Sequence, residues 1–141
     1  MDDLVLAKKA LADNEYTLCV FKNKEQVFFS KEIGVLTLYN AYKNGHRFNG
    51  CSAADKVIGL GAAFLWKALN VSKIDTGLIS KPALDFLNNN DIEISYRILT
   101  DRILNRTKDG YCPVETLAKD SLNFGEFLKG TGEFLKEKGL I

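Results

Sequence analysis

Short apolar runs of strand length alternate along this chain with segments whose apolar residues recur at helical spacing. The strand-like runs are Tyr16–Phe21, Gln26–Ser30, Ile74–Ile79 and Ile92–Ile98. The expected helices cover 4–12, 34–43, 52–69 and 82–87, with further helical segments from 113 and in the tail. Helices interleaved with strands predict a sheet covered on both faces. Because the polar segment Lys22–Glu25 makes the first two strands a hairpin, we predict a three-layer α/β/α sandwich with a mixed sheet.

Length and composition predict one globular domain over residues 1–141. An apolar content of 46% with a net charge of +1 excludes a disordered chain. The longest uncharged runs, 33–42 and 57–66, have ten residues each, whereas a membrane span needs about 20. The near-neutral charge provides no electrostatic footprint, so we expect neither nucleic acid nor a membrane as partner.

The cysteines indicate a reducing compartment. Cys19, Cys51 and Cys112 are odd in number and form no CxxC motif, and the acidic start Met1–Asp3 lacks the basic region of a signal peptide. We therefore expect a cytoplasmic protein with free thiols. No cluster of His and Cys with metal-ligand spacing is present, so neither a metal nor a cofactor is expected.

The segment 52–69 is interpreted as a central helix. Ser52 stands three residues before Asp55, an arrangement related to the capping box, and the following apolar residues cover most of a helical circumference. Gly59 and Gly61 weaken such a helix, so we expect a sheet or another helix to approach it closely.

The tail repeats the sequence Gly-Glu-Phe-Leu-Lys at 125–129 and 132–136. This spacing places Phe and Leu on one stripe of an amphipathic helix over about 122–138. The stripe docks either on its own domain or on a second copy, and the second alternative predicts a homodimer that acts as a non-catalytic interaction module.

Four stretches together resemble one bacterial family of unknown function with a cytidine deaminase-like fold. They are Asp55–Gly59 followed by alanines, Ile79–Leu84, Asn105-Arg106 and Cys112–Glu115. The similarity spans roughly residues 4–120 and implies a deaminase-like sandwich. The zinc chemistry of deaminases does not carry over, because that chemistry needs H-x-E and P-C-x-x-C motifs. The helix starts expected near Ser52 and Ser80 have no His and no Cys pair at these positions.

The resemblance implies a cleft into which two helix N-termini point. Free N–H groups and the positive dipole ends favour phosphate or carboxylate, so we expect a small anionic or nucleotide-like ligand. The six candidate ligand-binding residues are Asp55, Lys56, Ser80, Lys81, Asn105 and Arg106.

Each candidate also has a purely structural interpretation. Asp55 either contacts the ligand or caps its helix. Lys56 opposes the helix dipole, which a nearby anion would explain. Ser80 serves as an N-cap without any ligand, with Lys81 next to it. Arg106 either grips a phosphate or is an ordinary exposed loop residue.

The sequence assigns no catalytic residue, and it leaves open whether the protein is an enzyme. Cys112 precedes Pro113 at an expected helix start, where its thiolate would be stabilised as a nucleophile. No His base lies nearby in the sequence, so a structural thiol is the alternative. Glu115 is either an acid/base group beside Cys112 or a carboxylate of the first helical turn. Asp55 is a further weak candidate.

Overall fold

The computed structural model describes residues 2–32, 34–103 and 112–141, which form five strands and six helices. In chain order they are α1 (Asp3–Asp13), β1 (Leu18–Lys22), β2 (Glu25–Ser30), α2 (Gly34–Lys43), β3 (Ser52–Ile58), α3 (Leu60–Ala68), β4 (Lys73–Ser80), α4 (Lys81–Asn89), β5 (Glu93–Thr100), α5 (Pro113–Asp120) and α6 (Phe124–Glu137).

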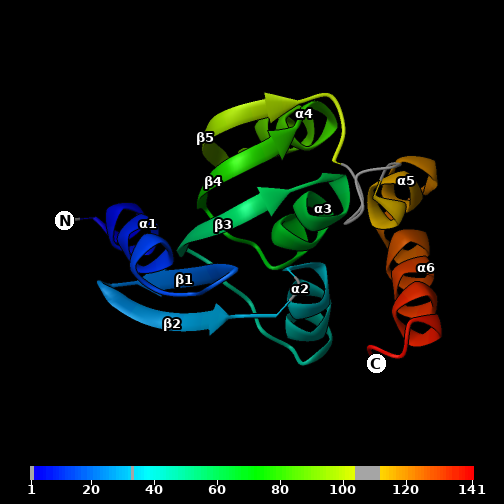
Figure 1. Cartoon of the computed structure of the whole chain (residues 1–141), viewed down its shortest axis with the longest axis horizontal. Helices are drawn as coiled ribbons and strands as arrows, with labels where there is room; N and C mark the ends of the chain where they lie inside the picture. The colour runs from blue at the N-terminus through cyan, green and yellow to red at the C-terminus, as the bar shows by residue number, and fades with distance from the viewer. Residues whose placement is uncertain (1, 33, 104–111) are drawn as a thin grey trace.

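The five strands form one mixed sheet in the order β2-β1-β3-β4-β5 (Figure 1). β1 pairs antiparallel with both β2 and β3, whereas β3, β4 and β5 are parallel to one another. The predicted N-terminal hairpin and the α/β class with a mixed sheet are therefore confirmed. Because β3, β4 and β5 are parallel, their carboxyl ends meet at one edge of the sheet, where α3 and α4 begin.

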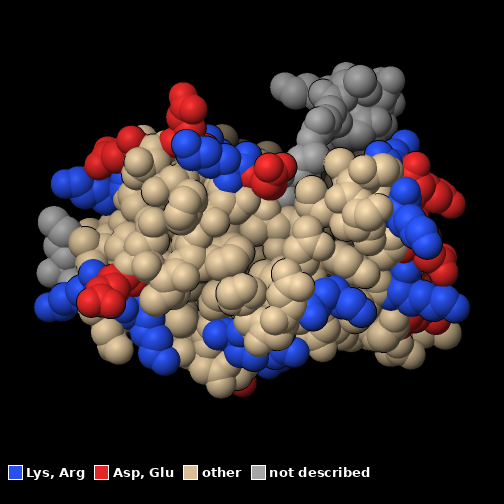
Figure 2. All heavy atoms as spheres, turned by 90° about the horizontal axis from the view of Figure 1, so that it is seen from below, with Lys and Arg blue, Asp and Glu red and all other residues tan. Residues whose placement is uncertain are grey.

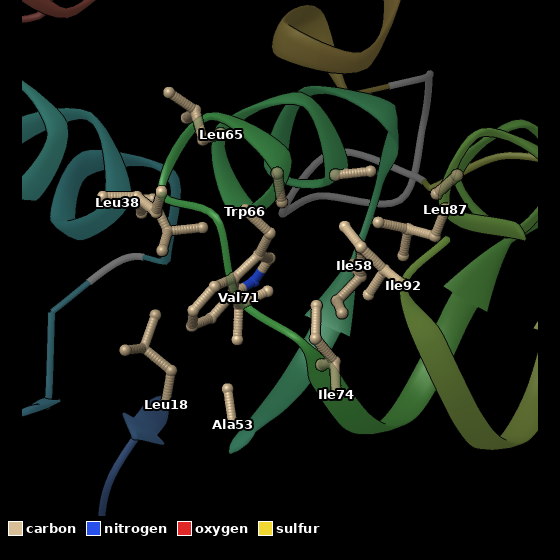
Figure 3. Packing of buried hydrophobic residues seen from close by; sticks show 14 of the residues in the cluster. Leu18, Leu38, Ala53, Ile58, Leu65, Trp66, Val71, Ile74, Leu87 and Ile92 are labelled. Carbon is tan, nitrogen blue, oxygen red and sulfur yellow. The ribbon is translucent and has the colours of Figure 1, made fainter. Parts of the chain in front are cut away.

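Helices pack against both faces of the sheet. On one face α1 covers β1 and β3 around a small core of Ala7, Cys19, Phe21 and Ala54. On the other face α2, α3 and α4 bury the main core, on which α5 and α6 also pack. Figure 3 shows side chains from β1, β3 and β4 meeting those of α2, α3 and α4 in this core, with Trp66 among them.

Several predicted helix boundaries are confirmed by their caps. The carboxylate of Asp2 accepts a hydrogen bond from the backbone N–H of Val5 at 2.9 Å and begins α1. Ser80 Oγ accepts one from Ala83 N–H at 3.3 Å and begins α4, with Pro82 in the first turn. The helix 34–43 and the helix start at Pro113 also lie where predicted.

The first half of the predicted central helix is wrong. Residues Ser52–Ile58 form β3, the middle strand of the sheet, and the helix begins only at Leu60 with Gly59 as its N-cap. The segment mixes small, charged and β-branched residues without strict alternation, so its sequence is easily assigned to the helix that follows. The close approach expected at the glycines is confirmed, because a Cβ on Gly61 would stand 2.6 Å from a side-chain carbon of Val114 on α5.

The apolar stripe of the tail is used within the chain itself. In α6, Phe127 and Leu135 are buried, while Leu128 and Phe134 pack partly exposed against the main core. The ring of Phe127 also contacts that of Phe64 on α3 at 5.1 Å between centroids. The stripe therefore packs on its own domain, and the homodimer stays a prediction.

Within the described residues, none of the helices has the length and apolar character needed to cross a membrane. On the face seen in Figure 2, charged side chains lie mainly toward the margin, with basic ones along the lower side and both signs elsewhere, and the centre is largely uncharged.

Candidate functional site

A small cavity of about 170 Å³ lies where α3 and α5 begin, at the carboxyl end of β3. Most of its lining is apolar or glycine, and its polar groups are one carboxyl and one thiol. The lining residues are Gly34, Val35, Val57, Gly59, Gly61, Ala62, Ile103, Cys112, Val114 and Glu115. The cavity therefore collects residues from α2, β3, α3 and α5, together with Ile103 from the segment after β5.

Glu115 provides the charged group of this cavity. Its side chain is 3% exposed, and its Oε2 accepts a hydrogen bond of 2.6 Å from the backbone N–H of Ile103. Its Oε1 is buried and has no hydrogen-bond partner within the described part of the chain. A buried acceptor without a partner costs about 1–3 kcal/mol, more when it is charged. Within the described residues, the free oxygen is therefore open to an additional hydrogen-bond donor.

The backbone around Glu115 is fixed from two sides. The Cys112 N–H donates to the carbonyl oxygen of Ile103 at 2.9 Å, and the Ile103 N–H donates to Glu115. Gly59 caps α3 without any side-chain hydrogen bond, and a Cβ at Gly59 would lie 3.5 Å from Glu115 Oε2. The carboxyl group therefore lies beside the amino end of α3.

Asp55 lies in the middle of β3 and not at a helix start, so its predicted capping role is wrong. Its carboxyl group is 2% exposed, and its Oδ2 accepts a hydrogen bond of 2.9 Å from the indole N–H of Trp66. Burial raises the pKa of Asp55 to about 7, although the bonds from Trp66 and from the backbone N–H groups of Val57 and Lys56 act in the opposite direction. Asp55 is not among the residues that line the cavity, but it lies beneath its rim, because a Cβ at Gly34 would stand 3.9 Å from Asp55 Oδ1.

Lys56 also lies in β3, so the expected conflict between its charge and a helix dipole does not exist. It lines a different cavity, together with Lys8 and Leu11 of α1, on the opposite face of the sheet. The structure therefore separates Asp55 and Lys56, which the sequence placed at one helix start.

The other predicted ligand residues do not join the Glu115 cavity. Ser80 is buried and acts as the N-cap of α4, and Lys81 is exposed on the first turn. Neither lines the cavity. Asn105 and Arg106 lie outside the described residues.

Cys112 and Glu115 are the predicted residues that the structure brings together, because both line this cavity. Cys112 is half-buried at the N-cap position of α5, whereas Cys19 and Cys51 are buried. Burial raises the pKa of Cys19 to about 11 and also raises the pKa of Cys51.

Native protein is therefore expected to expose one rapidly reacting thiol at pH 8, that of Cys112. Burial blocks access to Cys19 and Cys51 and keeps both protonated, while Cys112 opens into the cavity. The measurement is the time course of labelling with a chromogenic disulfide. Cys112→Ser should remove the fast phase and Cys51→Ser should leave it unchanged. A fast phase that persists in Cys112→Ser would contradict this assignment.

The described lining of this cavity contains few side chains that bind metal ions. Its lining supplies one thiol and one carboxyl group, and in the described ranges of the chain no three His, Cys, Asp or Glu side chains gather as metal ligands would. The residues at the starts of α2 and α3 are glycines, which offer only backbone groups.

Comparison with known proteins gives a fold and a family. The crystal structure of a DUF1893 family protein from Thermotoga maritima is similar to this chain with a TM-score of 0.84 and 23% sequence identity, and the match covers 94% of this chain and 90% of that one. No curated protein matches the sequence. The model of a family described as a domain of unknown function, DUF1893, matches residues 6–135, so this chain belongs to the DUF1893 family.

Proposed function

We propose that this protein binds a small, flat ligand bearing N–H groups, such as a nucleobase-like heterocycle, in the cavity beside Glu115. The observation that carries the proposal is the buried, unpartnered Oε1 of Glu115 within the described chain. A carboxylate oxygen accepts N–H donors strongly, and the charge assistance makes such bonds about twice as strong as neutral ones.

The size and walls of the cavity support a ring-sized ligand. Its volume of about 170 Å³ is well below the roughly 300–1,000 Å³ of sites for drug-sized ligands. Val35, Val57, Ile103 and Val114 supply apolar walls, and a planar ring makes favourable contacts with such walls through its faces. A base fits this description better than a complete nucleotide does.

The charge of the lining favours a neutral or cationic ligand. The cavity contains the carboxyl group of Glu115, and no Lys, Arg or His is among the described residues that line it. The expectation of a nucleotide-like ligand is therefore kept for the base, because the described lining offers no cation to an anionic group.

We further propose that the fold is a cytidine deaminase-like α/β/α sandwich without the zinc site. The strand order β2-β1-β3-β4-β5, with β1 antiparallel to its neighbours, supports this assignment. The starts of α2 and α3, at Gly34 and Gly59, line one cavity, although the pair of helix starts expected from the resemblance was the one near Ser52 and Ser80. Three free thiols support a cytoplasmic location.

The test uses protection of Cys112 as the readout, because this thiol lines the same cavity as Glu115. The probes are cytosine, guanine, adenine, uracil and acetamidine, each added during alkylation by iodoacetamide. At least one probe is expected to slow the labelling of Cys112 several-fold in the wild type, because an occupied cavity excludes the reagent.

Glu115→Gln is expected to abolish that protection. The glutamine oxygen must accept the hydrogen bond from the Ile103 N–H, so the amide NH₂ takes the place of Oε1. This NH₂ group then faces the N–H group of the ligand, and two donors cannot form a hydrogen bond with each other. Glu126→Gln, an exposed first-turn glutamate on α6, is the matched control and should keep the protection. Protection that is equal in Glu115→Gln, or absent with all five probes, would overturn the proposal.

A Cys112-dependent enzyme is the second candidate, because Cys112 and Glu115 line one cavity and pair a thiol with a carboxyl group that can accept its proton. The homodimeric interaction module stays a prediction.

A further inference from the structure

A second hollow lies on the opposite face of the sheet, between α1 and the strands β3, β4 and β5. Its volume is about 380 Å³, and its charged lining consists of Lys8, Lys56, Arg97 and Asp75. The three cations come from three different elements, α1, β3 and β5, which only the folded chain brings together. One carboxylate against three cations leaves a local charge of about +2 on a chain whose total charge is +1.

Asp75 is fully engaged within the protein and orients Arg97. Its side chain is 3% exposed, and the Arg97 guanidinium donates to both of its oxygens, through Nη2 to Oδ2 and through Nη1 to Oδ1. Ser95 Oγ also donates to Oδ1 at 2.7 Å. Because a buried carboxylate holds the planar guanidinium in place, the remaining Arg97 donors are presented in a fixed direction.

The two lysines are not neutralised by this carboxylate. Lys8 Nζ lies 4.0 Å from Asp75 Oδ1, at the limit of an ion pair, and its side chain is 47% exposed. Lys56 has no ion-pair partner within the described ranges and lines the same hollow. Two ammonium groups and an oriented guanidinium therefore face a space that contains no free acidic oxygen of the described chain.

We propose that this hollow binds a phosphate group of a small phosphomonoester, with Lys8, Lys56 and Arg97 as its ligands. A phosphate monoester carries about −1.5 to −2 charge at pH 7, which balances the local excess of positive charge. Its oxygens accept from ammonium and guanidinium groups in charge-assisted hydrogen bonds. The hollow lies on the α1 face, whereas the Glu115 cavity lies on the face of α2 and α3, so the two sites are independent.

The test is titration calorimetry with inorganic phosphate and with glycerol phosphate, in chloride buffers of fixed ionic strength. The double variant Lys8→Gln/Lys56→Gln is expected to bind both probes at least about tenfold more weakly than the wild type, because it loses two charge-assisted bonds. Both lysines are exposed, so the double variant should keep the circular dichroism spectrum and melting temperature of the wild type in chloride.

The matched control Lys9→Gln/Lys31→Gln removes the same charge at two other exposed lysines and should keep wild-type affinity. Glu115→Gln should also keep it, so failure here is distinguishable from failure at the Glu115 cavity. Equal affinities in the two double variants would show nonspecific attraction and overturn the proposal, as would the lack of measurable binding of either probe to the wild type.

Discussion

Trp66→Ala is expected to lower the free energy of unfolding by about 3–5 kcal/mol, the range for deleting a large aromatic side chain from a core. Trp66 is fully buried on α3 in the main core, and its ring lies 6.2 Å from that of Phe48 between centroids. Its removal also takes away the indole N–H that binds the buried carboxyl group of Asp55. Figure 3 shows it where side chains from the sheet and from α3 meet, so neighbours on several elements lose contacts together.

The measurement is urea denaturation followed by circular dichroism at pH 7. For a domain whose total stability is about 5–15 kcal/mol, a loss of this size moves the midpoint far toward zero denaturant or unfolds the protein. Trp66→Phe is the second variant, because it keeps most of the apolar volume and loses only the donor to Asp55. Its loss should be smaller than that of Trp66→Ala. Two variants with equal small losses, under about 1 kcal/mol, would mean that this side chain is not packed as described.

Much of the fold is predictable from the sequence because most elements have local signals. The helix starts at Asp2 and Ser80 have capping side chains, and Pro82 and Pro113 lie where a missing N–H has no cost. The hairpin of β1 and β2 follows from two apolar runs separated by a polar turn. In each case the deciding interaction lies within a few residues along the chain.

β3 could not be recognised by the same means, because its environment is set by tertiary pairing. Ala53 and Ala54 are small residues that a helix also accepts, and here they pair with β1 and β4 and are buried in the cores on opposite faces of the sheet. The local signal that marks the true boundary is Gly59, which follows a β-branched pair and precedes a denser apolar run. The spacing of Ser52 and Asp55 resembles a capping box, so the helix was expected to start at 52. The observed start is at 60, eight residues later.

The helix starts that line the Glu115 cavity are not the pair near Ser52 and Ser80 that the sequence predicted. Three of its components, the helix starts at Gly34 and Pro113 and the side chain of Glu115, were each recognised separately. Their meeting depends on the order of strands in the sheet, which places α2, α3 and α5 around one end of β3. The sequence singled out Lys56 because its charge was expected to oppose a helix dipole, but Lys56 lies in a strand. Its neighbours Lys8 and Arg97 are distant in sequence and come close only in the fold.

Asp55→Asn is expected to change the pH dependence of stability. Burial raises the pKa of Asp55 from 3.8 to about 7 in the folded protein, so between these two values the folded state holds a proton that the unfolded state has released. The stability that this proton contributes is fully present below pH 3.8 and is lost as the pH rises through about 7. The slope reaches about 1.4 kcal/mol per pH unit.

Asparagine keeps the shape of the side chain and an oxygen for the Trp66 indole, but it does not titrate. From pH 5 to pH 8 the wild type should therefore lose roughly 2–3 kcal/mol relative to Asp55→Asn. The measurement is urea denaturation of both proteins at pH 5, 6, 7 and 8, with the difference between the two taken at each pH so that all other titrating groups cancel.

The control Asp85→Asn removes a carboxyl group that is exposed on α4. The difference in the free energy of unfolding between this variant and the wild type should not show the same dependence on pH. Stability curves of wild type and Asp55→Asn that run parallel from pH 5 to pH 8 would mean that Asp55 is solvated in the folded protein. In Trp66→Phe the opposing donor is lost, which raises the pKa of Asp55 further. The stability of that variant should consequently fall over a window that extends to higher pH than in the wild type, which identifies the Asp55–Trp66 pair as the origin of the effect.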